Sequence, residues 1–347
     1  LGPTQDDLTK ETIAKAMGDV VVENPACMKY LKENYERAGR KMTPNNLKQA
    51  YMPSRATVLP NDAGTAPGFA LEQDGKIIIA MPGPPREMQR MFELQVKPLL
   101  QKKQDSVIYY RMLRMFGIGE SSLETVLLPL IDGQTDPTLA TYAKEGECSL
   151  RIASKRATEE EARAAVDEMT EKVRSLVGDY IYSYDDEDLI DVVGRLLLEK
   201  KITIACAESC TGGLFAGALT DTSGISEVFG HGYVTYSCEA KETELGVKPE
   251  TIETYGVVSP QVAEEMAAGL AAKTGAKLCI SVTGLAGPDG GSAEKPVGLA
   301  YIGVSYEGRL YAVKSYYRNV SRKWNRHYTL LRMLFEVYRL ISPENPA

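Results

Sequence analysis

Ser209 lies where a short apolar run, Ile202–Ala205, gives way to the small residues of segment 207–213, Ala-Glu-Ser-Cys-Thr-Gly-Gly. A serine on a tight turn between a strand and a helix exposes its hydroxyl, while backbone N–H groups of the helix point at whatever binds. This pattern predicts a nucleophile. The alternative is that Ser209 only caps the helix predicted over Leu214–Leu219, as serines at such positions commonly do.

A nucleophilic serine needs a base. The chain contains only two histidines, His231 and His327, and neither stands in a recognisable triad setting. A lysine can replace histidine as the base, provided that burial and neighbouring positive charge lower its pKa toward neutrality. We therefore expect Lys241 to be the base; it closes the segment Thr-Tyr-Ser-Cys-Glu-Ala-Lys at 235–241, which follows another apolar stretch.

Two further segments could bind an anion. Residues 283–291, Thr-Gly-Leu-Ala-Gly-Pro-Asp-Gly-Gly, follow a strand-like run, and glycines let backbone N–H groups approach a phosphate or a developing oxyanion. Arg322 and Arg326 are four residues apart at the start of a helix predicted to begin after Ser321. Cations there oppose the helix dipole, which a bound phosphate would offset. The alternatives are that segment 283–291 is an ordinary turn and that Arg322 and Arg326 are solvated on an exposed helix face.

These segments, in this order, resemble the C-terminal domain of the CinA family over Leu189–Ile341. The resemblance implies a nicotinamide mononucleotide deamidase in which Ser209 and Lys241 form the catalytic pair, with Tyr236 beside them. No metal or organic cofactor is expected for this reaction. The resemblance and the glycine and arginine patterns together suggest the substrate contacts Glu208, Cys210, Thr211, Gly212, Thr283, Gly284, Gly287, Gly290, Gly291, Arg322 and Arg326.

The N-terminal part has its own resemblance. Its opening Leu-Gly-Pro-Thr-Gln-Asp-Asp-Leu-Thr, the loop at 64–68 and the segment Pro-Gly-Pro-Pro-Arg-Glu at 82–87 are similar to the molybdopterin-binding-like (MoCF) domain of full-length CinA proteins. That resemblance implies an ADP-ribose pyrophosphatase. The family domain has a further β-α-β-α unit before this point, so we expect a truncated domain in a fragment that starts with leucine. The ligand candidates are Asp6, Asp7, Asn61, Gly64, Thr65, Gly83 and Glu87.

Asp6 and Asp7 could hold a divalent metal that bridges a pyrophosphate. The alternative is that they are acids placed favourably at a helix N-terminus. In the same region, helices expected over 10–17 and 26–38 and a strand over 77–80 predict an α/β unit with a parallel sheet.

Residues 106–185 read as strand (108–116), helix (121–131), strand (148–153), long helix (159–177) and strand (180–183). This α+β segment resembles the KH-like middle domain of the CinA family. A nucleic-acid-binding KH module needs a Gly-x-x-Gly loop, which segment 117–120 does not supply, so we expect a structural spacer. The acidic run 185–188 is the expected linker into the last domain.

A chain of 347 residues is long enough for two or three domains. We expect an α/β multidomain protein: an incomplete MoCF-like domain over 1–104, a KH-like α+β domain over 105–185 and an α/β CinA domain over 186–347. A net charge of −7 argues against direct binding to nucleic acid. No apolar run is long enough to span a membrane, and no signal-like N-terminus is present.

The six cysteines are scattered, without a disulfide or zinc pattern, which fits a reducing cytoplasm. We expect a cytoplasmic homodimer whose partner is the small nucleotide substrate, nicotinamide mononucleotide, with ADP-ribose as a second ligand. Two alternatives stay open: an enzyme whose main activity is pyrophosphate cleavage in the N-terminal domain, and a non-enzymatic partner protein in competence or recombination.

Overall fold

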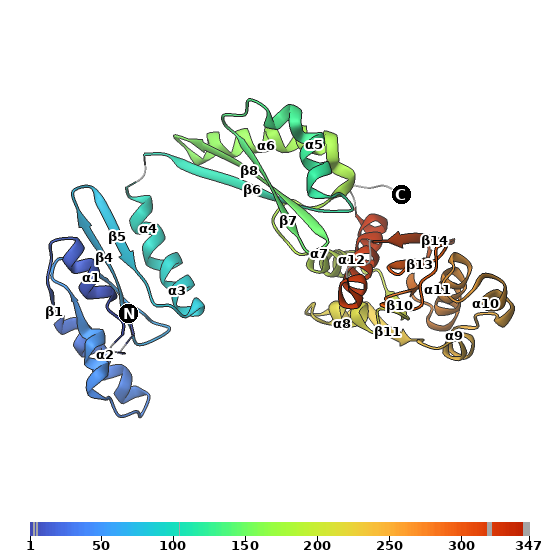
Figure 1. Ribbon diagram of the computed structural model, residues 1–347, viewed down its shortest axis with the longest axis horizontal. Helices are drawn as coiled ribbons and strands as arrows, with labels where there is room; N and C mark the ends of the chain where they lie inside the picture. Colours follow the sequence, from blue (N-terminus) through green and yellow to red (C-terminus); the bar gives the residue numbers. More distant parts are fainter. Residues whose placement is uncertain (3, 5, 104, 318–320, 343–347) are drawn as a thin grey trace. The chain divides into compact units, whose positions relative to one another are not determined.

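The computed structural model describes residues 1–342 except 3, 5, 104 and 318–320. It divides into two compact units, Leu1–Asp105 and Ser106–Ala347 (Figure 1). The second unit contains two separate sheets, so the chain has a three-domain layout. In the described ranges, no helix combines the length and the apolar character needed to cross a membrane.

The first unit packs two helices, α1 (Thr9–Ala16) and α2 (Pro25–Arg37), with two small sheets around a core that includes Leu31, Met52 and Phe69. The first sheet joins β1 (Val21–Glu23) to β2 (Tyr51–Pro53), and the second has the order β3 (Thr57–Leu59), β4 (Gly68–Gln73), β5 (Lys76–Ala80). The remaining elements are a 3₁₀ helix η1 (Pro44–Ala50), α3 (Pro85–Met91), a π-helical segment η2 (Phe92–Val96) and α4 (Lys97–Gln101).

The parallel sheet expected for this region is wrong. Every strand pair described in the first unit is antiparallel. For β4 and β5 the reason lies in the turn between them, where Asp74 and Gly75 both take positive φ angles, 50° and 73°. An Asp-Gly pair in this conformation reverses the chain within two residues and makes a hairpin.

The middle domain is a four-stranded antiparallel sheet backed by two helices. Its strand order is β7 (Thr138–Lys144), β8 (Glu147–Arg156), β6 (Val107–Phe116), β9 (Ile181–Ser183), with α5 (Glu120–Ile131) and α6 (Glu159–Val177) packed on one core. A short 3₁₀ turn, η3 (Gly178–Tyr180), precedes β9. Strand β7, which was not predicted from the sequence, lies at the edge of this sheet and pairs with β8.

The C-terminal domain is a mixed sheet between two helical layers. The strand order is β11 (Phe229–Val234), β10 (Ile204–Glu208), β12 (Leu278–Gly284), β13 (Leu299–Tyr306), β14 (Arg309–Tyr316), in which the first three strands pair in parallel and β13 runs antiparallel to both of its neighbours. One core joins the sheet to α7 (Leu189–Lys200), α8 (Leu214–Thr220) and α12 (Arg322–Ile341). The other face carries α9 (Cys238–Leu245), α10 (Pro249–Tyr255) and α11 (Pro260–Thr274); the 3₁₀ turn η4 (Ile225–Glu227) precedes β11.

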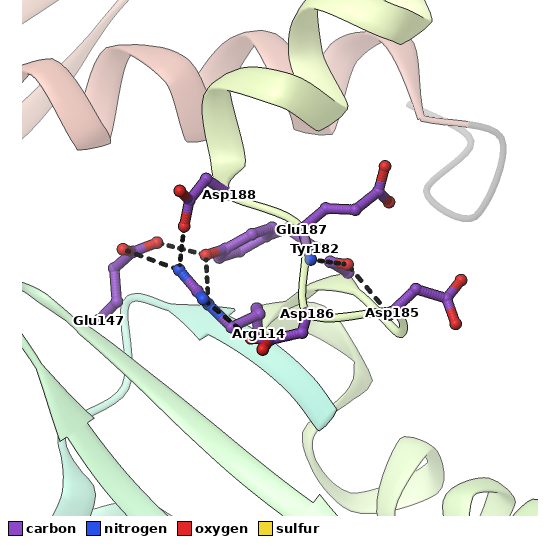
Figure 2. Close-up of polar contacts among 8 residues, drawn as sticks. Arg114, Glu147, Tyr182, Asp185, Asp186, Glu187 and Asp188 are labelled. Atoms are coloured by element: carbon purple, nitrogen blue, oxygen red, sulfur yellow. Dashed lines mark hydrogen bonds and ion pairs between the residues drawn. The ribbon is translucent and has the colours of Figure 1, made fainter. Parts of the chain in front are cut away.

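A buried arginine joins the middle and C-terminal domains (Figure 2). Arg114, on β6, is 3% exposed and donates to Asp186 Oδ1 at 2.9 Å and Asp188 Oδ1 at 2.6 Å, both in the acidic segment before α7. It also donates to the Tyr182 hydroxyl, which in turn donates to Glu147. Within the same unit, the Phe116 ring contacts Tyr328 and Phe335 of α12. Charge and aromatic packing therefore fix these two domains against each other.

Candidate active site

Ser209 and Lys241 meet at the carboxyl edge of the parallel strands. Ser209 directly follows β10, and Lys241 lies in α9, which the Ser237 hydroxyl caps by accepting from the N–H of Ala240. Lys241 Nζ lies 3.1 Å from Ser209 Oγ. In open α/β sheets this edge is where ligands bind, because the loops that leave neighbouring parallel strands converge there.

Lys241 is fully buried, and its amine lies against backbone carbonyls and the Ser209 hydroxyl. Its Nζ donates to the Thr235 carbonyl at 2.7 Å and, more weakly, to the carbonyls of Tyr236 and Ser237, both at 3.5 Å. Within the described part of the chain it forms no salt bridge. Burial lowers the pKa of Lys241 because the ammonium form loses hydration. The neutral amine, which can accept the Ser209 proton, is thereby favoured.

Ser209 and Lys241 open onto a cavity of about 320 Å³. Five of the residues predicted to contact substrate line it: Cys210, Thr283, Gly284, Gly287 and Arg322. Cys210 is buried, and burial raises the pKa of its thiol to about 11, so it is a neutral wall of the cavity rather than a second nucleophile. The cavity is large enough for part of a small polar ligand and is open toward solvent at its exposed residues, among them Tyr236, Cys238 and Asp289.

Glu208 does not line this cavity, which corrects its predicted contact with substrate. Its side chain is fully buried, and its carboxylate accepts from the N–H groups of Gly213 at 3.0 Å, Phe215 at 3.1 Å and Ala216 at 2.9 Å. These are the free N–H groups at the start of α8. Glu208 thus caps that helix, whose N-cap residue is Gly213 and not Ser209.

Tyr236 lies at the exposed rim of the cavity, with its side chain turned to Arg322. Arg322 donates through Nη2 to the Tyr236 hydroxyl and through Nη1 to the Gly287 carbonyl, both at 2.7 Å. The contacts described for the Tyr236 side chain do not include Ser209; only its backbone carbonyl reaches Lys241. At this point the glycine-rich loop presents the Gly287 carbonyl to Arg322.

The other predicted contacts lie outside the cavity lining. Arg326 donates through Nε to the Cys210 carbonyl at 3.1 Å and through Nη2 to the Thr211 carbonyl at 2.6 Å, so its guanidinium holds the backbone next to Ser209. Thr211 is fully buried. The remaining three, which are Gly212, Gly290 and Gly291, do not line the cavity; Gly212 and Gly290 take positive φ angles of 60° and 87°.

Several residues that line the cavity escaped the sequence analysis. Ser237 and Cys238 lie within the segment that led to Lys241, so their proximity could have been inferred. Val257 and Val258 come from the loop before α11 and carry no local signal; a hydrogen bond of 2.7 Å from the Thr283 hydroxyl to the Val257 carbonyl ties that loop to β12. Leu285, Ala286 and Asp289 complete the lining.

The candidates of the first unit are only partly brought together. Asn61 is buried and donates to Glu87 Oε2 at 2.6 Å, and a Cβ on Gly64 would stand 2.1 Å from that same oxygen. Thr65 is partly buried and Gly83 exposed, and no contact described for either joins them to this cluster.

Asp6 and Asp7, the predicted metal ligands, lie just before the start of α1. The Asp7 carboxylate accepts from the N–H groups of Gly2 at 2.6 Å and Thr9 at 3.1 Å. These contacts lower the pKa of Asp7 even though burial acts to raise it. The described residues hold no group of three or more acidic, histidine or cysteine side chains that could bind a metal. The alternative reading, an acid at the start of α1, describes Asp7 better.

Comparisons with known proteins give one consistent family. The sequence pattern of the CinA C-terminal domain matches residues 186–341, that of the damage-inducible protein CinA KH domain matches 110–183, and that of a molybdopterin binding domain matches 1–102. A protein of Clostridium kluyveri whose name contains the words competence-damage inducible protein is 48% identical over 311 residues, or 89% of this chain and 76% of that protein.

A relative with the same words in its name, from Clostridioides difficile, is 47% identical over 330 residues, or 93% of this chain and 79% of that protein. The crystal structure of competence/damage inducible protein CihA from Agrobacterium tumefaciens is 40% identical; the match covers 43% of this chain and 93% of that chain, with a TM-score of 0.41. The similarity to the two clostridial relatives extends through all three domains.

Proposed function

This chain belongs to the CinA family, and on that premise we propose that its C-terminal domain hydrolyses the carboxamide of nicotinamide mononucleotide to the carboxylate and ammonia. The observation that carries the proposal is the 3.1 Å contact between Ser209 Oγ and the buried amine of Lys241. A hydroxyl beside a lysine with a lowered pKa is a means of acyl transfer that needs no histidine.

The reaction proceeds in two halves. Lys241, as a neutral amine, takes the Ser209 proton while Oγ attacks the carboxamide carbon, and the resulting ammonium protonates the departing nitrogen, so ammonia leaves. Water then attacks the acyl-enzyme with the same lysine as base, which regenerates Ser209. The N–H of Cys210, the residue after the nucleophile, is the natural donor to the oxyanion, as in other strand-turn-helix nucleophile sites.

Arg322 is the better of the two predicted phosphate anchors because it lines the cavity. Its guanidinium has five N–H donors, and the two bonds described for it, to Gly287 and Tyr236, leave others for an anion. A charged hydrogen bond to a phosphate contributes roughly 1.5–3 kcal/mol, which corresponds to about tenfold or more in binding.

An ammonia-release assay with the mononucleotide and its dephosphorylated riboside tests substrate and anchor together. We expect turnover of the mononucleotide by the full chain, and a KM for it that rises about tenfold or more in Arg322→Ala, with little change for the riboside. Equal effects on both compounds would place Arg322 away from the phosphate. No ammonia from either compound would refute the proposed substrate.

A further inference from the structure

Arg326 is engaged with the backbone of the nucleophile turn rather than with the cavity. It lies one helical turn after Arg322 on α12, yet its guanidinium reaches the carbonyls of Cys210 and Thr211 at 3.1 and 2.6 Å. These are the two residues that directly follow Ser209. A planar guanidinium that bonds two successive carbonyls fixes the orientation of both peptide groups.

Fixing a carbonyl also fixes the N–H on the opposite edge of the same peptide plane. The first peptide of the turn is held in another way, because the N–H of Gly212 donates to the Ser209 carbonyl at 3.0 Å. Three consecutive peptide groups after Ser209 thus have their carbonyls bound. Among the described residues, no carbonyl or carboxylate accepts from the N–H of Cys210, which is the predicted oxyanion donor.

Glu208 holds the same turn from the side of the sheet. Its buried carboxylate binds three N–H groups at the start of α8. Arg326, which lies on α12, binds two carbonyls of the turn. Gly212 and Gly213 take φ angles of 60° and 95°, which other residues adopt only with strain. A left-handed turn of this kind needs external contacts to keep one shape, and an anion on one side with a cation on the other provides them.

We propose that Arg326 is a positioning residue for the reaction and does not bind the substrate. Its bond to the Thr211 carbonyl orients the N–H of Gly212 in the same peptide plane, and that N–H binds the Ser209 carbonyl. In this way Arg326 holds Ser209 toward Lys241 and, one peptide further, holds the N–H of Cys210 in place for the oxyanion. The inference deepens the proposed function and rests on it for the identity of the substrate. Its structural basis, the two bonds to the turn, is independent of which amide or ester is hydrolysed.

Kinetics of Arg326→Ala, Arg326→Lys and the controls Arg322→Ala and Lys323→Ala separate positioning from anchoring. A misplaced reacting group costs about 10²-fold in rate, so kcat for mononucleotide and riboside should fall by about that factor in both Arg326 variants, with KM within threefold. Lysine should not substitute, because it cannot bond both carbonyls as a fork. Lys323 is exposed in the same helical turn and should leave both constants unchanged.

Added guanidinium ion at low millimolar concentration should restore part of kcat to Arg326→Ala and none to Arg322→Ala. A rise in KM for the mononucleotide alone, with kcat intact, would make Arg326 a phosphate anchor and overturn the inference. Far-ultraviolet circular dichroism identifies a variant that fails to fold. If Arg326→Ala fails to fold, Arg326→Lys, which keeps the charge and approximate length of the side chain, distinguishes positioning from phosphate anchoring.

A second readout does not depend on the substrate. A fluorophosphonate probe labels an activated serine by forming an O–P bond and releasing fluoride, and mass spectrometry locates the label. We expect labelling of Ser209 in the wild type, slowed at least tenfold by Arg326→Ala and unchanged by Lys323→Ala. If Ser209 is labelled in the wild type and more slowly in Arg326→Ala, but the wild type releases no ammonia, then the proposed substrate is wrong and the positioning role stands. Labelling that is as fast in Arg326→Ala as in the wild type refutes the positioning role.

Discussion

Lys241 is a buried amine beside Ser209 Oγ, and burial favours its neutral form at a lower pH than for an exposed lysine. The base must be neutral to accept a proton, so kcat/KM should rise with pH as Lys241 loses its proton, with a midpoint below the ordinary lysine value of about 10.4. A pH profile of ammonia release measures this midpoint. A rate that is independent of pH, or that falls as pH rises through this range, would contradict the assignment.

The same residue allows a test of charge against basicity. Lys241→Arg should be as inactive as Lys241→Ala, because a guanidinium group keeps its proton throughout the accessible pH range. An active arginine variant would mean that position 241 only supplies positive charge and that another group is the base. Ammonia release by the three proteins at one pH decides between these results.

At the residue scale, the sequence predicted which side chains to examine but not what each one does. Ser209 could be selected because it follows a predicted strand, and Lys241 because it closes the second of three motifs that occur in a fixed order. The structure places Lys241 Nζ 3.1 Å from Ser209 Oγ. Glu208 could not be assigned. Neighbouring side chains of a strand point to opposite faces, so an acid next to the nucleophile caps α8 instead of contacting a ligand.

At the element scale, Glu208 provides a stability prediction. Glu208→Gln replaces a buried acceptor of three N–H groups with an amide, one end of which is a donor. Bonds to a charged group contribute roughly 1.5–3 kcal/mol, so the free energy of unfolding should fall by about that amount in urea titrations. Glu250→Gln, an exposed acid in the first turn of α10, is the matched control and should change it by at most about 0.5 kcal/mol. Equal losses in both variants would refute the capping role.

The elements themselves were largely predictable where the pattern was long. The helix over 159–177 is capped by Thr158, whose hydroxyl accepts from the N–H of Glu161, as its Thr-and-glutamate signature indicates. The antiparallel arrangement of the first unit could not be read from the alternation of helices and strands, because for β4 and β5 it depends on the local Asp74-Gly75 turn. Strand β7 was missed because an edge strand is only partly buried and has a weak apolar signal.

At the scale of the whole molecule, the junction of the middle and C-terminal domains depends on Arg114. Arg114→Ala leaves the largely buried Glu147 without its cation, so the 106–347 unit should lose roughly 1–3 kcal/mol of unfolding free energy. Arg195→Ala, whose partners Glu187 and Glu199 are more exposed, should cost no more than about 1 kcal/mol. Calorimetry of the full chain compares the two. A smaller loss for Arg114→Ala than for Arg195→Ala would contradict this role.

This junction could not be predicted from the sequence. Arg114 and its partners Asp186 and Asp188 are 72 and 74 residues apart, and an acidic run read alone indicates only a linker or the start of a helix. Neither segment contains a signal that predicts contact with the other, because this contact depends on how the two domains pack. The same applies to Arg326, whose helix begins more than a hundred residues after the turn that it holds.

The most direct test of the central claim is ammonia release from nicotinamide mononucleotide by the wild type, Ser209→Ala and Ser237→Ala. Ser237 also lines the cavity, but its hydroxyl only accepts the N–H of Ala240 at the start of α9. Loss of a nucleophile reduces turnover by several orders of magnitude, whereas loss of a helix cap costs about 1 kcal/mol of stability. We predict that Ser209→Ala is folded and inactive and that Ser237→Ala retains most of its activity. A folded Ser209→Ala protein that releases ammonia at a near-normal rate would contradict the Ser209–Lys241 mechanism.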